Sequence, residues 1–126
     1  MSRRKFQIDL FDFILAIAKV VDLMSPQIGK HHMQVAYLAY RIGEQLGMDE
    51  NKLRDLLIAG IFHDIGAFSL RERLDLLTFE DKHPGVHAEA GYLILRQLDF
   101  FATIADIIRF HHVFWNNGRG NYMGNQ

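Results

Sequence analysis

Apolar residues recur at steps of mostly three and four along nearly the whole chain, and this spacing is the strongest constraint on the fold. The series Leu10, Ile14, Ile17 and Val21 is an example. Because an α-helix has about 3.6 residues per turn, such residues share one face of a helix. No segment shows the period-two alternation that is typical of a half-buried strand. The sequence therefore predicts an all-α fold.

Proline, glycine and capping residues set the expected helix boundaries. We expect a first helix over residues 6–23, a second that ends at Gly47, and a third that Asp49 caps and Gly66 closes. Three further helices are expected over residues 70–77, 84–98 and 101–114. The apolar stripe expected on the second helix consists of Val35, Leu38, Ala39, Ile42 and Leu46.

Length and composition indicate one compact domain over residues 1–126. Hydrophobic residues make up 49% of the 126 positions, and no low-complexity linker precedes residue 116. Residues 116–126 are rich in Gly and Asn, and we expect them to be a loop or a frayed end. A domain of this size buries enough surface to fold without disulfides or a structural metal. Any metal site in it must therefore serve another purpose.

Charge and cysteine content exclude several classes of function. The 14 Lys and Arg against 15 Asp and Glu give a net charge of −1, without the positive surplus of a protein that binds nucleic-acid polymers. The absence of cysteine excludes a thiolate zinc site and a cysteine nucleophile. Asp9 and Asp12 interrupt the apolar N-terminal segment, and no uncharged run approaches the roughly 18 residues of a membrane span. We expect a cytoplasmic protein without membrane insertion.

Seven histidines remain to be explained, and most align with the apolar face of their helix. His31 continues the line of Val35 and Leu38, so it is the better inward candidate of its pair. His32 is turned toward Ala36, and we expect it at the surface or in a supporting position. The inward candidates on the later helices are His63, Asp64, His87, His111 and His112.

These nitrogen and oxygen donors on four helices predict a metal centre. A lone inward histidine is usually a hydrogen-bonded core residue, but several converging polar groups are tolerable in a core when they coordinate a metal. The donor set suits a divalent transition metal such as Fe, Mn or Zn, and it exceeds the four ligands of one tetrahedral ion. Two ions bridged by the carboxylate of Asp64 would clamp the attacking and leaving oxygens of a phosphoryl displacement.

The ordered pattern of His31, His63-Asp64, His87 and His111-His112 resembles the HD superfamily of metal-dependent phosphohydrolases. The resemblance covers most of the chain and is closest to the HD-GYP branch, the cyclic di-GMP phosphodiesterases. It implies a compact bundle of helices in which Asp64 bridges two metals and, with His63, belongs to the catalytic centre. It assigns His31 and His63 to one metal, and His87, His111 and His112 to the other.

The chain departs from this branch at several positions. The lysine expected to contact the scissile phosphate is Ala67, and the GYP loop is degenerate, so Arg119 is the candidate to replace that lysine as a phosphate ligand. The late aspartate ligand has no counterpart, because no Asp or Glu follows Asp106. We therefore expect either that the chain is truncated at its C-terminus, which we favour, or that the first metal site is open and weak. Phe114 and Trp115 are expected as core or capping residues, and stacking on a nucleobase is the less favoured alternative.

Two functions from different classes follow. The first is a metal-dependent phosphohydrolase, in particular a phosphodiesterase acting on a cyclic dinucleotide or another nucleotide phosphate. The second is a catalytically weak or inactive HD-type module for signal transduction that binds metal, nucleotide or a protein partner. The apolar residues spread around the first helix indicate a packing partner, such as a second copy or a fused signalling domain.

Overall fold

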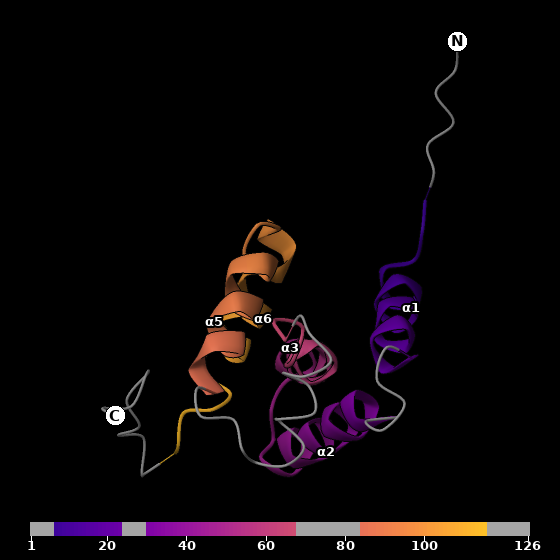
Figure 1. Ribbon diagram of the computed structural model, residues 1–126. Helices are drawn as coiled ribbons and strands as arrows, with labels where there is room; N and C mark the ends of the chain where they lie inside the picture. The colour runs from indigo at the N-terminus through magenta and orange to yellow at the C-terminus, as the bar shows by residue number, and fades with distance from the viewer. Residues whose placement is uncertain (1–6, 24–29, 68–83, 116–126) are drawn as a thin grey trace.

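The computed structural model describes residues 7–23, 30–67 and 84–115, and its elements are all helical (Figure 1). These residues contain no β-strand, so the all-α prediction is confirmed. None of their helices is long and apolar enough to cross a membrane. The helix expected over residues 70–77 lies outside the described residues. The elements are α1 (Leu10–Leu23), α2 (His31–Gln45), α3 (Glu50–Phe62), α5 (Pro84–Leu95), the 3-10 helix η2 (Asp99–Phe101) and α6 (Ala102–Arg109).

Helix α3 is the central element, and it contacts α1, α2 and α6 (Figure 1). Helices α5 and α6 pack on each other beside α3, on the side away from α1. The core is formed by apolar side chains from α1, α2, α3, α5, η2 and α6, which include Ile14, Ala36, Ile61, Phe62, Leu95, Phe101, Ile104 and Ile108. Burying each of the larger ones contributes about 1.5–3 kcal/mol to the hydrophobic driving force.

Small residues, rather than the large apolar ones, form the face of α2 that packs on α3. Ala36 is fully buried, whereas Leu38 and Ile42 are each 59% exposed. A Cβ placed on Gly60 would lie 2.5 Å from the Cα of Ala36, so the two backbones are in contact there. The predicted stripe is therefore wrong, because close contact of the two backbones requires small side chains on the buried face.

Hydrogen bonds explain why α1 begins later than expected and why the α2–α3 boundary is as expected. The carboxylate of Asp9 accepts the backbone N–H groups of Phe11 (2.9 Å) and Asp12 (3.2 Å), so α1 begins at Leu10 rather than at residue 6. Gly47 terminates the α2 segment with a φ of +71°, and Asp49 caps α3 by accepting from the Lys52 N–H at 3.0 Å. Both of these boundary predictions are confirmed.

Three later helices end earlier than predicted. After α3, the backbone hydrogen bonds change from a spacing of four residues to one of three, and the Ile65 N–H donates to the Phe62 carbonyl at 2.9 Å. The chain after α6 behaves in the same way, with the Val113 N–H donating to the Phe110 carbonyl at 2.9 Å. Helix α5 ends at Leu95 rather than at residue 98. As a result, His63-Asp64 and His111-His112 lie in turns that follow their helices.

An ion pair and a stacked ring join α5 to α6. The guanidinium of Arg109 donates two hydrogen bonds to the carboxylate of Glu89, at 2.9 and 3.2 Å. The same guanidinium lies 4.3 Å from the centre of the Tyr92 ring. Because the pair is partly exposed, it contributes about 1 kcal/mol or less. Its two hydrogen bonds nevertheless fix the position of α5, which carries His87, along α6, which precedes His111.

A glycine sets the distance between the turn after α3 and helix α5. A Cβ on Gly66 would overlap the carbonyl oxygen of His87 and would lie 2.5 Å from the backbone nitrogen of Gly91. Both neighbours are backbone atoms, which cannot move aside as the end of a flexible side chain can. The absence of a side chain at Gly66 therefore allows the turn that carries Asp64 to lie against α5.

We expect Gly66→Ala to destabilise the fold by about 3 kcal/mol, because the added methyl group forces the turn away from α5. Gly47→Ala is the matched control, since nothing lies within 4 Å of its Cβ and only the cost of its positive φ, about 1 kcal/mol, applies. The measurement is the free energy of unfolding in denaturant for both variants. Equal losses would contradict the close contact at Gly66.

Candidate metal centre

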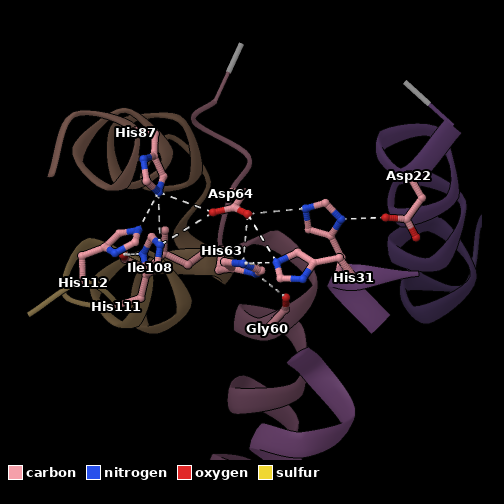
Figure 2. Close-up of polar contacts among 10 residues, drawn as sticks. Asp22, His31, Gly60, His63, Asp64, His87, Ile108, His111 and His112 are labelled. Carbon is pink, nitrogen blue, oxygen red and sulfur yellow. Dashed lines mark hydrogen bonds and ion pairs between the residues drawn. The ribbon is translucent and has the colours of Figure 1, made fainter. Parts of the chain in front are cut away.

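The carboxylate of Asp64 lies at the middle of a cluster of histidines (Figure 2). Its side chain is 11% exposed and sits in the turn that follows α3. One oxygen, Oδ2, lies 3.0 Å from His63 Nε2 and 3.7 Å from His31 Nε2. The other, Oδ1, lies 3.4 Å from His87 Nε2 and 3.8 Å from His111 Nε2. Each oxygen of Asp64 therefore faces a different set of imidazoles.

The donor atoms form two groups that share Asp64. One group consists of His31, His63 and Asp64, and the other consists of Asp64, His87, His111 and His112; in each group the donor atoms lie within 4.8 Å of one another. Figure 2 shows the second group between the turn after α6 and helix α5, and the first beside the start of α2. The structure thus brings together all six residues of the predicted metal centre.

Backbone carbonyls orient two of these rings. The carbonyl of Gly60 lies 2.8 Å from His63 Nδ1, and that of Ile108 lies 2.6 Å from His111 Nδ1 (Figure 2). Because a carbonyl oxygen only accepts, each Nδ1 carries the proton and donates it. Each Nε2 is then turned toward the cluster. Such an outer hydrogen bond is the usual support of a histidine that binds a metal.

The separations within the cluster fit a divalent ion. The Nε2 atoms of His31 and His63 lie 3.3 Å apart, those of His87 and His111 3.3 Å apart, and those of His87 and His112 2.9 Å apart. Two ligand atoms about 2.0–2.2 Å from one ion lie roughly 3 Å from each other. Lone pairs facing each other at these distances repel unless a proton or a metal lies between them. The arrangement therefore has the donors and the spacing of a metal site.

The structure corrects the placement of the two histidines that begin α2. His32 is 1% exposed, so the expectation of a surface position is wrong. His31 has a 37% exposed side chain, although its Nε2 reaches the cluster. His32 lies on the small-residue face with Ala36 and Gly43, which is the face that packs on α3. Those small residues were the signal in the sequence that could have identified the buried face.

Other predicted features are not among the donor groups of the cluster, or they lie outside the described residues. Arg119, the candidate phosphate ligand, belongs to residues 116–126 and is not among the described residues. Ala67 is fully buried and offers no cation. Phe114 and Trp115 are 87% and 79% exposed, so the expectation that they are core residues is wrong. They closely follow His112 in the sequence, but their rings lie outside the core.

A family model described as "HD domain" matches residues 28–124, which includes every residue of the cluster. The chain belongs to the HD domain family. The predicted resemblance to the HD superfamily, on the side of its HD-GYP phosphodiesterases, is thereby confirmed.

Relatives of this HD domain include two phosphodiesterases. The 3'3'-cGAMP-specific phosphodiesterase 1 of Vibrio cholerae is 24% identical over 113 residues, and the cyclic di-GMP phosphodiesterase of Thermotoga maritima is 25% identical over 126 residues. These matches cover 89% and 91% of this chain, but only 26% and 34% of the relatives. A ribonuclease Y of Onion yellows phytoplasma is 30% identical over 88 residues, 70% of this chain and 14% of the relative. No solved structure matches.

The carboxylate at the centre of this HD domain is ionised. Burial raises the pKa of Asp64, but hydrogen bonds from His63 and His87 outweigh burial and hold this pKa far below its usual range. For His63, burial lowers the pKa, but the hydrogen bond to Asp64 and the attraction of its charge raise it above the ordinary 6.5. In the metal-free protein, this contact of 3.0 Å therefore favours the protonated form of His63.

Two other imidazoles of the cluster resist protonation. Burial lowers the pKa of His111 to about 4, even though its bond to the Ile108 carbonyl acts in the opposite direction. Burial, followed by repulsion from His63, also lowers the pKa of His31. Because a metal binds the neutral imidazole, these rings are ready to act as ligands at neutral pH.

The metal-free protein is expected to lose stability as the pH falls from 6.5 toward 4. In this range the unfolded chain binds a proton at His111, whereas the folded protein does not. The free energy of unfolding therefore falls by up to about 3 kcal/mol. The lowered pKa of His31 acts in the same direction. His63, whose pKa is raised, acts in the opposite direction near the upper end of this range. Denaturant unfolding in the presence of a chelator measures this dependence. His111→Gln should flatten it, whereas constant wild-type stability across this range would contradict it.

Proposed function

We propose that this HD domain is a metal-dependent phosphohydrolase, and specifically a phosphodiesterase that acts on a cyclic dinucleotide or another nucleotide phosphate. The observation that carries the proposal is the position of Asp64, whose two oxygens face two separate groups of imidazoles. This is the arrangement that a pair of bridged divalent ions requires. Membership of the HD domain family supports the same reaction class.

The proposal assigns roles to the residues of the cluster. Asp64 bridges the two positions, and it forms the catalytic centre together with His63, whose Nε2 lies 3.0 Å from it. The first position is held by His31 and His63, and the second by His87, His111 and His112. Divalent ions such as Fe, Mn or Zn, when bound, would acidify a water molecule and neutralise charge on the phosphate. The rings of His63 and His111 are fixed by the hydrogen bonds that they donate to backbone carbonyls.

Two observations support a nucleotide as the substrate. Two relatives are named as phosphodiesterases of cyclic di-GMP and of 3'3'-cGAMP. In addition, the exposed residues Phe114 and Trp115 closely follow His112, a member of the cluster, in the sequence. An exposed aromatic ring beside a phosphate site can stack on a nucleobase. The proposal is that the phosphate of such a nucleotide lies at Asp64 and that its base stacks on one of these exposed rings.

One feature favours the second function, a signalling module with weak or no hydrolysis. Ala67 stands where the HD-GYP pattern places a lysine for the scissile phosphate, and it is fully buried. In this alternative, the HD domain binds metal or nucleotide and acts on a partner or fused domain.

The first test is the metal content of protein purified without a chelator or a histidine tag. We expect about two divalent ions per chain in the wild type. Asp64→Ala should remove both, because it takes away the shared ligand, whereas His87→Ala should remove mainly the second. Elemental analysis after gel filtration measures these contents. Equal losses in the two variants would contradict the division into two positions.

The second test is hydrolysis. The wild type, loaded with Mn²⁺ or Fe²⁺, should hydrolyse cyclic di-GMP or 3'3'-cGAMP, and Asp64→Asn should lower the rate by at least about 100-fold, since an amide cannot replace a bridging carboxylate. Asp106→Asn is the control, because it makes the same change at an exposed position on α6 outside the cluster and should leave the rate unchanged. A metal-loaded wild type that binds these nucleotides without cleaving them would favour the signalling module.

A further inference from the structure

His32 is buried beside the cluster but belongs to neither group of donors described above. It is 1% exposed, and its Nδ1 lies 2.6 Å from Oδ1 of Asp22, near the end of α1. Its other ring nitrogen, Nε2, is buried and has no hydrogen-bond partner within the described part of the chain. Burying a polar atom without a hydrogen-bond partner costs free energy of folding. A ligand bound to this nitrogen would remove that cost.

The unpaired nitrogen points into the cluster. It lies 4.0 Å from Oδ2 of Asp64, the oxygen that faces the first group. The ring centre of His32 lies 5.4 Å from those of His31 and His63. A separation of 4.0 Å is too long for a hydrogen bond, but two atoms that each lie about 2.0–2.2 Å from one ion can be this far apart.

Asp22 determines which nitrogen of His32 is available. Its carboxylate accepts a hydrogen bond, so Nδ1 carries the proton and donates it. Nε2 is then left with its lone pair directed at Asp64. Figure 2 shows Asp22 reaching from α1 toward the cluster. A carboxylate, a histidine and a metal in this order are a recurring arrangement, in which the carboxylate orients the ring and raises its basicity.

We infer that His32 Nε2 is an additional ligand of the first metal position, with Asp22 as its positioning residue. This inference rests on the proposed metal centre. The first group then has four donors, namely His31, His32, His63 and Asp64, which equals the number in the second group. It also makes α1 a functional part of the site, because Asp22 is the contact through which that helix holds the ligand.

The competing possibility is a purely structural pair that ties α1 to α2. Both possibilities predict that losing His32 or Asp22 lowers the stability of the metal-free protein. Only ligation predicts that the affinity and the spectrum of the bound metal change as well. The experiment therefore needs a direct measure of the metal, separate from both folding and catalysis.

The test uses Co²⁺ alone as the probe, titrated into the full chain after chelator treatment, with its visible absorption bands as the readout of coordination. His32→Gln should weaken Co²⁺ binding at the first position by about 10–100-fold and change the intensity of those bands. Asp22→Asn should weaken it by about 10-fold, because the amide orients the ring less strongly. Asp12→Asn, the same change at an exposed site on the same helix, should leave binding unchanged.

The outcomes separate the inference from the proposed function. If the wild type binds Co²⁺ and folded His32→Gln binds it with the same affinity and spectrum, His32 is only structural and the inference is wrong. If His32→Gln does not fold, Asp22→Asn decides, and unchanged binding in that variant overturns the inference. If the wild type itself binds no Co²⁺, the proposed metal centre and this inference fail together.

Discussion

The structure depends on a negative charge held in the interior of a helical domain. Asp64 is nearly buried, and an ionised carboxylate in such a place is tolerable only when cationic or hydrogen-bonding partners surround it. Its partners come from α2, from the turn after α3, from α5 and from the turn after α6. Helices that are distant in the sequence must therefore meet at one carboxylate.

Close backbone contacts make this meeting possible. Gly60 lets α2 approach α3, and Gly66 lets the turn carrying Asp64 approach α5. A larger side chain at either position would separate elements whose donor atoms lie about 3 to 4 Å from Asp64. The glycines thus control ligand geometry without touching a ligand side chain. The pair of Arg109 and Glu89 complements them by fixing α5 against α6.

Sequence reasoning succeeded where a residue type has one physical role. The helical periodicity predicted the fold class, and Gly47 and Asp49 predicted a helix boundary, because a positive φ and an N-terminal cap are local requirements. The same reasoning selected the six residues of the cluster, since several inward histidines and an aspartate are rarely tolerated in a core unless they bind a metal. It failed on the buried face of α2, where hydrophobicity favoured Leu38 and Ile42 but backbone contact favoured Ala36.

The sequence by itself determined an all-α chain with its chemistry concentrated in histidines and one aspartate, because periodicity and residue type are properties of neighbouring positions. Only the tertiary structure decided which member of the pair His31-His32 is buried, since that depends on how closely α2 and α3 pack. It alone brought Asp22 to His32, ten residues apart and on different helices. Contacts of this kind are set by the packing of helices on one another, which no local pattern encodes.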